Sequence, residues 1–212
     1  MEIRNLKFNF LGDSITEGVG VSDPEKKYVS VFASKYGPLL ARNYGIAGTR
    51  FARQQSPTVN NPSYDRDFCS RVCELDADAD VVVVYGGVND FGHGDAPFGC
   101  FEDRTPDTFM GACHVLMTSL IERFPLATIV FMTPLHGTCE EKPNKRPLCD
   151  YVQAIREVAA YYAIPVLDLY TVSGLQPKVP ILKSTYLPDS VHPNEAGAER
   201  IADRLAAFLQ AL

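Results

Sequence analysis

The sequence predicts an α/β protein built on a doubly wound, parallel sheet of five strands. Two observations lead to this prediction. Apolar runs alternate with stretches of helical periodicity along the whole chain, as they do where helices connect the strands of a parallel sheet. Residues 81–84 are four consecutive valines, and a strand that is apolar on both sides needs helices on both faces of its sheet.

The first half of the chain supplies three strands and two helices. They are expected at residues 6–11 (strand), 28–36 (helix), 40–44 (strand), 68–75 (helix) and 81–85 (strand). In both helices the apolar residues recur at three- and four-residue steps, which places them on one helical face. Gly12 and Gly45 end the first two strands, because glycine permits the sharp change of direction that follows a strand.

The second half supplies two more strands and three helices. Thr105-Pro106-Asp107 predicts a helix start, since a capping hydroxyl, an N-terminal proline and an early acid favour one. That helix is expected to end before Pro125. The remaining elements are a strand at 128–132, a helix at 151–162, a strand at 166–169 and a helix at 201–209.

The composition indicates a single globular domain over residues 1–212. The chain has 212 residues with 46% hydrophobic and 22% charged side chains and contains no repeat or linker that would divide it. Three connections are long for this fold, at residues 54–64, 91–104 and 134–147, and long loops in compact domains are usually functional. We therefore expect them to influence substrate choice.

Charge and cysteine content exclude several kinds of partner. The net charge of −6 predicts no general attraction to nucleic acid or to an anionic membrane. The N-terminus lacks signal-peptide features and the longest apolar run is five residues, so a cytoplasmic protein without membrane contact is expected. The six cysteines lack zinc-site spacing, which predicts reduced, mostly buried thiols, no metal and no cofactor.

Four segments that follow strands carry the polar residues best suited to chemistry. In an open α/β sheet the ligand binds beyond the carboxyl ends of the strands. The residues at these ends are Ser14, Gly48, Asn89 and the Asp189–His192 pair. Each alone has a structural explanation, such as a helix cap, a turn or a loop pair. Together they place a hydroxyl, amide donors and an Asp-x-x-His pair on one edge.

These residue types indicate nucleophilic catalysis on an acyl group. A serine such as Ser14 becomes nucleophilic when a histidine, here His192, accepts its proton, and a carboxylate such as Asp189 orients that histidine. The backbone N–H groups of Ser14 and Gly48 and the side-chain amide of Asn89 are candidates for an oxyanion hole.

The same residues resemble the SGNH (GDSL-like) hydrolases. The matching blocks occur in family order, and they are Gly12-Asp13-Ser14-Ile15, Gly48, Gly87-x-Asn89-Asp90 and Asp189-x-x-His192-Pro193. The resemblance implies a flavodoxin-like α/β/α fold, with Ser14 as nucleophile, His192 as base and Asp189 as its orienting acid. It also implies an oxyanion hole of Ser14, Gly48 and Asn89. Ile15 departs from the leucine of the family name.

The expected reaction is hydrolysis of a carboxylic ester through an acyl-Ser14 intermediate. The expected substrates are small molecules with short acyl or acetyl groups, including those carried on carbohydrates. A thioesterase or lysophospholipase would use the same residues. From other classes, a flavin- or nucleotide-binding protein of the same fold and an inactive carbohydrate-binding module remain alternatives.

Several residues near the strand ends are candidates for the substrate pocket. They are Asp13, Arg50, Asp90 and His136, with His93 as a further histidine on a glycine-rich loop. Arg50 and Arg53 would suit an anionic or polyhydroxyl substrate. The short basic run at residues 142–146 is expected to be a solvated surface.

Overall fold

The computed structural model describes all 212 residues and contains one parallel sheet of five strands. The strand order is β2-β1-β3-β4-β5. The strands are β1 (Lys7–Gly12), β2 (Leu40–Gly45), β3 (Val81–Tyr85), β4 (Thr128–Met132) and β5 (Val166–Leu167). This is the flavodoxin-like order, so the predicted fold class is confirmed.

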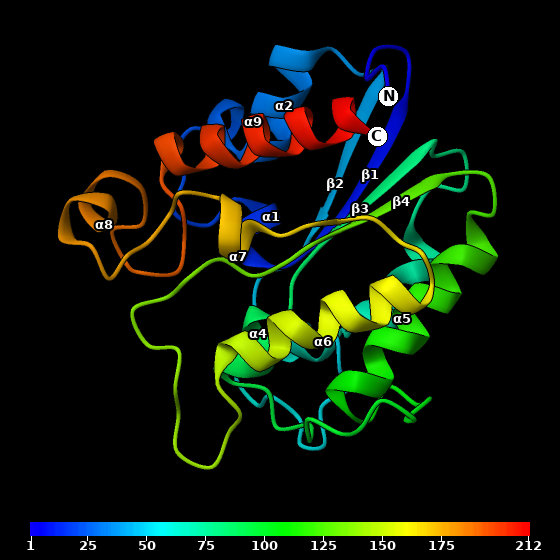
Figure 1. Ribbon diagram of the computed structural model, residues 1–212, viewed down its shortest axis with the longest axis vertical. Helices are drawn as coiled ribbons and strands as arrows, with labels where there is room; N and C mark the ends of the chain where they lie inside the picture. Colours follow the sequence, from blue (N-terminus) through cyan, green and yellow to red (C-terminus); the bar gives the residue numbers. More distant parts are fainter.

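Helices cover both faces of the sheet (Figure 1). On one face lie α2 (Tyr28–Tyr36) and α9 (Glu195–Ala211), which pack on each other. On the other lie α3 (Phe68–Arg71), α5 (Phe109–Arg123) and α6 (Leu148–Tyr161). The shorter helices are α1 (Ser14–Glu17), α4 (Val88–Gly92), α7 (Leu169–Val172) and α8 (Pro180–Tyr186), with 3₁₀ turns at Pro24–Lys26, Pro62–Asp65 and Val72–Glu74.

The four valines of β3 divide between two hydrophobic cores. The side chains of Val82 and Val84 pack in the core under α5 and α6. Those of Val81 and Val83 pack in the core under α2 and α9. All four are at most 1% exposed, as expected for a central parallel strand whose alternate side chains point to opposite faces.

Several predicted elements differ from the structure at their ends; the last helix, for example, begins at Glu195 and not at residue 201. The fifth helix is capped by Thr108, whose hydroxyl accepts from the amide of Gly111 at 3.1 Å, so the helix start predicted at Thr105 is wrong. The helix predicted at 68–75 is one α-turn followed by a 3₁₀ turn. The fifth strand has only two residues, because Leu169 begins α7 instead.

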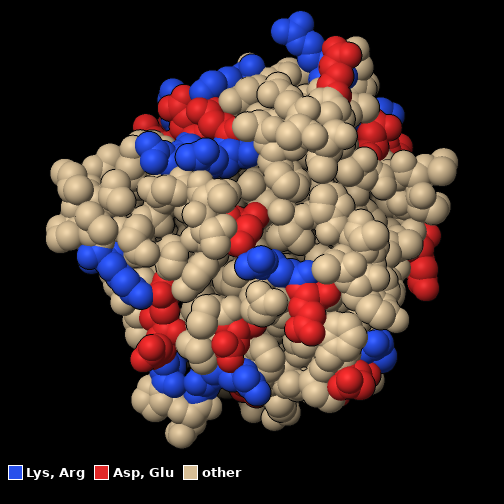
Figure 2. Space-filling view, viewed as in Figure 1, with Lys and Arg blue, Asp and Glu red and all other residues tan.

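The charged side chains, the helices and the cysteines can each be compared with what the composition predicted. Acidic and basic side chains are interspersed on the face shown in Figure 2. None of the helices combines the length and the apolar character that crossing a membrane requires. None of the six cysteines is paired, and four are exposed while only Cys113 is buried. The expectation of mostly buried thiols is therefore wrong.

The carboxyl ends of the central strands lie level with one another and define the edge that carries the site. Gly12 at the end of β1 is in register with Gly45 of β2 and with Tyr85 of β3. The chain runs to opposite sides of the sheet from β1 and β3, which makes this the topological switch point where ligands bind in such folds. The segments after β1, β2 and β3 therefore meet here.

Candidate active site

Ser14 is the first residue of α1, directly after β1. Asp13 caps this helix, because its Oδ1 accepts a hydrogen bond from the amide of Ile15 at 3.0 Å. The turn requires glycine at Gly12, where a Cβ atom would lie 1.9 Å from Oγ1 of Thr16. The strand end and the cap together hold the Ser14 hydroxyl just below the surface, where the residue is 6% exposed.

His192 comes from the opposite end of the chain, in the turn between α8 and α9. Asp189 folds this turn, since its Oδ1 accepts from the amides of Val191 at 2.9 Å and His192 at 2.7 Å. Ser190 has φ +75°, a left-handed conformation that is costly for a residue with a side chain. Gly20 lets a second loop approach, because a Cβ there would lie 2.9 Å from Cβ of His192.

Ser14, His192 and Asp189 form a continuous chain of hydrogen bonds. Nε2 of His192 lies 2.9 Å from Oγ of Ser14, and Nδ1 lies 2.7 Å from Oδ2 of Asp189. Burial alone would raise the pKa of Asp189, but hydrogen bonds from the Val191 amide and from His192 outweigh it and lower the pKa. The ionised carboxylate accepts the Nδ1 proton, which leaves Nε2 to accept from the serine.

Three hydrogen-bond donors lie beside Ser14. The amides of Ser14 and Gly48 donate to no other group of the protein, and both residues line the same cavity as Asn89. Nδ2 of Asn89 donates one hydrogen to the carbonyl of Thr49 at 3.0 Å and keeps its second. Gly48 has φ +76°, and a Cβ there would lie 2.3 Å from the ring of Tyr64.

Gly45 lies only three residues before Gly48 but has a different role. Its amide donates to Oδ1 of Asn43 at 2.8 Å. A Cβ atom on Gly45 would lie 2.1 Å from the amide nitrogen of Glu17, so this glycine lets β2 end against α1. Of the two glycines, Gly48 alone lines the cavity.

Asp13 and Asp90 were expected in the substrate pocket, but neither lines the cavity. The carboxylate of Asp90 accepts from the amides of Phe51 at 3.0 Å and Ala52 at 2.9 Å. It thereby holds the loop that follows Gly48. Burial raises the pKa of Asp90 to about 7 and that of Asp13 to about 6. Asp90 thus supports the loop after Gly48 and Asp13 the start of α1, and neither side chain belongs to the cavity lining.

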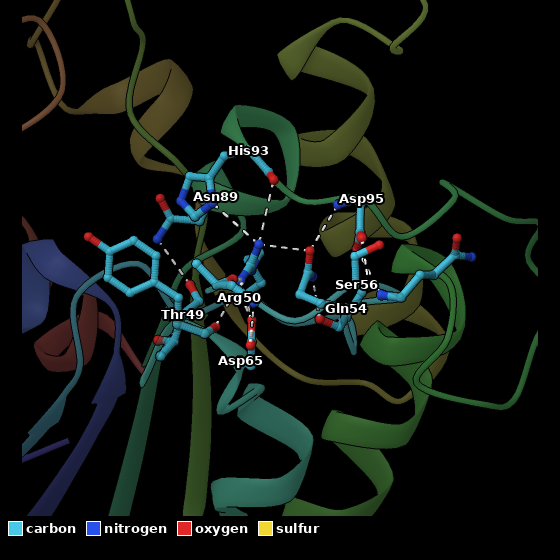
Figure 3. A network of polar contacts seen from close by, with 12 residues as sticks. Thr49, Arg50, Gln54, Ser56, Asp65, Asn89, His93 and Asp95 are labelled. Carbon is cyan, nitrogen blue, oxygen red and sulfur yellow. Dashed lines mark hydrogen bonds and ion pairs between the residues drawn. The ribbon is translucent and has the colours of Figure 1, made fainter. Parts of the chain in front are cut away.

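Arg50 was also expected in the pocket, and its side chain instead turns inward (Figure 3). It is 3% exposed, and burial lowers its pKa. Its partners are the side chains of Gln54, Thr58, Asp65 and His93 and the carbonyl of Tyr64. A buried guanidinium needs several acceptors, and this loop supplies them. Arg53 is exposed and pairs with Asp107 at 3.4 Å.

A second buried arginine, Arg71, was not singled out by the sequence reasoning. Its guanidinium donates to the carbonyls of Gly12 and Tyr44 and to Oγ1 of Thr49. Its side chain also lies over the ring of Phe68, 5.2 Å from the centroid. Arg71 therefore ties the ends of β1 and β2 to the loop that carries Gly48. In the sequence, this role was indicated only by an arginine within the apolar helical pattern of residues 68–75.

The basic run at residues 142–146 is only partly a solvated surface. The ammonium of Lys145 donates to the carbonyls of Asp90 and Phe91, each at 3.2 Å. Lys142 donates to the carbonyl of Gly92. Positive charges at the carboxyl end of a helix are favourable, so both lysines hold the end of α4, the helix that carries Asn89.

A cavity of about 560 Å³ opens over Ser14. All three long loops contribute to its lining, with Tyr64 from 54–64, His93 from 91–104 and His136 from 134–147. Apolar side chains complete it, including those of Ile15, Val88, Phe91, Leu135 and Leu148. The size suits a small-molecule ligand. The predicted placement of His136 in the pocket thus agrees with the structure.

The arrangement combines the parts that acyl-group chemistry needs. A serine hydroxyl beside a histidine acceptor can attack a carbonyl carbon. Hydrogen-bond donors at the same cavity can stabilise the negative oxygen that such an attack creates. No group of three or more His, Cys, Asp or Glu side chains is arranged to hold a metal ion.

Comparison with known proteins identifies a family. The model of the GDSL-like lipase/acylhydrolase family matches residues 10–200. A protein from Lactobacillus plantarum has a crystal structure that is 30% identical and superimposes with a TM-score of 0.86, covering 99% of this chain and 98% of its own. No functionally curated protein matches the sequence.

More distant structures share the fold. A protein named as a GDSL-like lipase from Bacteroides uniformis is 20% identical with a TM-score of 0.72, covering 98% of this chain and 97% of its own. The salicylyl-acyltransferase SsfX3 of a tetracycline biosynthetic pathway is 21% identical with a TM-score of 0.68. That match covers 98% of this chain and 55% of SsfX3.

Proposed function

Because this chain belongs to the GDSL-like lipase/acylhydrolase family, we propose that it hydrolyses carboxylic esters with Ser14 as the nucleophile. The observation that carries the proposal is the pair of hydrogen bonds from Ser14 Oγ to His192 Nε2 at 2.9 Å and from His192 Nδ1 to Asp189 at 2.7 Å. This geometry matches the roles of nucleophile, base and orienting acid.

In the first half of the reaction Ser14 Oγ bonds to the ester carbonyl carbon as its proton passes to Nε2 of His192. The carbonyl oxygen becomes negative and accepts hydrogen bonds from the amides of Ser14 and Gly48 and from Asn89. The bond between carbon and the alcohol oxygen then breaks. His192 returns the proton to that oxygen, so the alcohol leaves neutral and the acyl group remains on Ser14.

In the second half a water molecule takes the place of the alcohol. His192 accepts a proton from the water as its oxygen bonds to the acyl carbon. When the tetrahedral intermediate collapses, Ser14 Oγ leaves and regains a proton from His192. The products are a carboxylic acid and the free enzyme. Throughout, the negative charge of Asp189 stabilises the positively charged form of the His192 ring.

Short acyl groups, acetyl included, suit the site best. The cavity of about 560 Å³ is of a size that holds a small molecule. A sugar bearing an acetyl ester falls within this class. A thioesterase or lysophospholipase would use the same three residues, and a comparison of substrates distinguishes them.

The structure favours hydrolysis over flavin or nucleotide binding at the same strand ends. A phosphate at the start of α1 would need free backbone amides. The amide of Ser14 is free, but that of Ile15 already donates to the carboxylate of Asp13 at 3.0 Å, and the negative charge of this carboxylate would repel a phosphate. A purified protein that binds no flavin, judged by its absorbance spectrum, is the expected result.

The proposal is tested with p-nitrophenyl esters from acetate to palmitate. Wild-type protein should hydrolyse the short esters fastest, while Ser14→Ala and His192→Ala should lose the activity on every chain length. Equal, slow rates for wild type and both variants would exclude a serine esterase. Activity that rises toward palmitate would support a lipase instead, and higher activity on acyl thioesters a thioesterase.

A further inference from the structure

Two histidines that the proposed reaction does not use line the same cavity as Ser14. His93 follows α4, and His136 follows β4. Each ring has one nitrogen held by a charged neighbour, Arg50 in one case and Glu140 in the other. In each ring Nε2 has no hydrogen-bond partner within the protein. Because the two neighbours have opposite charge, they impose opposite roles on the two free nitrogens.

His93 presents a hydrogen-bond donor. Its Nδ1 lies 3.3 Å from Nη1 of Arg50 (Figure 3), and a guanidinium can only donate. Nδ1 must therefore accept, which leaves the ring proton on Nε2. Partial burial and then the positive charge of Arg50 lower the pKa of His93 to about 4. The ring is thus neutral at physiological pH, and its Nε2–H is free to donate.

His136 presents a hydrogen-bond acceptor. Its Nδ1 lies 2.6 Å from Oε1 of Glu140, which also accepts from the amide of Gly137 at 3.1 Å. Burial alone would raise the pKa of Glu140, but the hydrogen bonds from Lys178 and His136 outweigh it and lower the pKa. The carboxylate is therefore ionised and accepts the Nδ1 proton. In the neutral ring Nε2 then carries a lone pair.

The ring of His136 is held in place from a second side. Its centroid lies 3.7 Å from that of Tyr170, whose hydroxyl donates to the other oxygen of Glu140 at 3.3 Å. The side chain of Glu140 is only 10% exposed. A ring fixed by stacking and by a nearly buried carboxylate keeps one orientation, which is what selective recognition requires.

We propose that His93 and His136 recognise the hydroxyl groups of an ester whose alcohol part is a polyol, such as a sugar. This inference rests on the proposed function. The proton on Nε2 of His93 and the lone pair that Nε2 of His136 carries when Nδ1 donates to Glu140 match hydroxyl groups, because each hydroxyl can both donate and accept. Since the acyl group is short, the hydroxyl groups belong to the alcohol.

The positive charges around the cavity bear on the charge of the alcohol. The ammonium of Lys142, a lining residue, lies 5.4 Å from the centroid of the Phe91 ring. Together with the guanidinium behind His93 it disfavours a cationic alcohol such as choline. The apolar side chains of Leu135 and Leu148 line the same cavity and can contact the carbon skeleton of the alcohol.

The test compares two acetate esters that differ in the alcohol. One is p-nitrophenyl acetate, whose alcohol has no free hydroxyl group, and the other is a monoacetylated methyl glucoside or monoacetylglycerol. The variants His93→Phe and His136→Phe keep an aromatic ring and remove the nitrogen. Each should lower kcat/KM for the polyol acetates about five- to tenfold, as expected for one lost hydrogen bond. The ratio of kcat/KM for the polyol acetates to kcat/KM for p-nitrophenyl acetate should therefore fall in each variant.

A matched pair of variants tests the tautomer of His136. In Glu140→Gln the amide can donate to Nδ1, which would turn Nε2 of His136 from acceptor to donor. Selectivity for polyol acetates over p-nitrophenyl acetate should then fall. Glu141→Gln makes the same chemical change at the next, exposed residue and should leave the selectivity unchanged.

The outcomes distinguish a failure of the recognition proposal from a failure of the proposed hydrolase function. The recognition proposal would be overturned by equal losses on both classes of ester or by unchanged selectivity in all variants. It would also be overturned by a wild type that cleaves p-nitrophenyl acetate but neither polyol acetate. A wild type as inactive as Ser14→Ala on every ester would instead overturn the proposed hydrolase function.

Discussion

Two histidines that line the cavity are each paired with a carboxylate at a similar distance, but they differ in the group that their Nε2 atoms meet. Nδ1 of His192 is 2.7 Å from Asp189, and Nδ1 of His136 is 2.6 Å from Glu140. Nε2 of His192 meets the Ser14 hydroxyl at 2.9 Å, whereas Nε2 of His136 meets no group of the protein. The pair alone therefore does not define a catalytic site, because the nucleophile must also be in reach.

The supports of the two pairs differ as well. Asp189 has a side chain that is 54% exposed and is held by amides of its own turn, while Glu140 is 10% exposed and receives Lys178 and Tyr170. Donors for a negative oxygen, including Asn89, lie beside Ser14. The carboxylate of the His192 pair is thus open to solvent, whereas that of the His136 pair is held by charged and aromatic neighbours.

The largest expected effect separates the two histidines. His192→Ala should lower kcat for p-nitrophenyl acetate by about 10⁴-fold or more, because the base of a serine nucleophile is lost. His136→Ala should lower it less than about tenfold. Steady-state kinetics on both purified variants measure this, with circular dichroism as the control for folding. Similar losses in both variants would remove the distinction between the pairs.

The next effect concerns the donors that only the Ser14 side possesses. Asn89→Ala should lower kcat by about 10²–10³-fold with a smaller change in KM, since the side-chain amide acts on the charge that develops in the transition state. A loss of this size expressed in KM alone would instead assign Asn89 to substrate binding. The melting temperature serves as the control, because Asn89 also donates to Thr49.

The buried carboxyl group of Asp13 predicts that the stability of the protein depends on pH. The pKa of Asp13 is raised by burial to about 6 in the folded protein, above the value of about 3.9 in an unfolded chain. Its stabilising contribution is thus complete below about pH 4 and is lost as the pH rises through 6. Asp13→Asn keeps a capping side chain and should remove this dependence.

The measurement for Asp13 is urea unfolding of wild type and variant between pH 4 and 8. The gain in unfolding free energy of Asp13→Asn relative to wild type should grow with pH by up to about 3 kcal/mol. A difference that stays constant over this range would show that the Asp13 carboxyl titrates alike in the folded and unfolded chain.

The smallest expected effect tests whether Lys145 positions α4, the helix that carries Asn89. Lys145→Met removes the ammonium that donates to the carbonyls of Asp90 and Phe91 and should loosen α4. We expect kcat for p-nitrophenyl acetate to fall about fivefold, equivalent to about 1 kcal/mol. Arg146→Met is the matched control, since its side chain is 60% exposed and pairs with Asp150. Equal effects in both variants would contradict a positioning role for Lys145.

Most of the fold could be predicted because it depends on local patterns. The valines of β3 and the helical spacing of residues 28–36 match the structure residue for residue, since burial on a strand or helix face leaves a periodic trace in the sequence. The start of α5 could not be located, because Thr105 and Thr108 both offer a capping hydroxyl. The contact of Thr108 with the amide of Gly111 decided between them.

The residues at the strand ends could be proposed from the sequence, whereas their supports could not. Arg50 and Asp90 looked like pocket residues because they neighbour the site in sequence. Their side chains are buried, and the direction of a side chain depends on loops that fold around it. Arg71 was not predicted and Lys145 was expected in a solvated run, since most of their acceptors are carbonyl groups, which every residue has.

The sequence by itself determined the sheet, its order of segments and the set of polar residues at one edge, because strands of a parallel sheet present their carboxyl ends together. Only the tertiary structure decided that Nε2 of His192 lies within hydrogen-bond distance of Ser14 and that Nε2 of His136 has no partner within the protein. It also placed Arg50 beside His93 and Glu140 beside His136, so that the two rings have neighbours of opposite charge. These contacts join irregular loops across long sequence separations, and no periodic pattern records them.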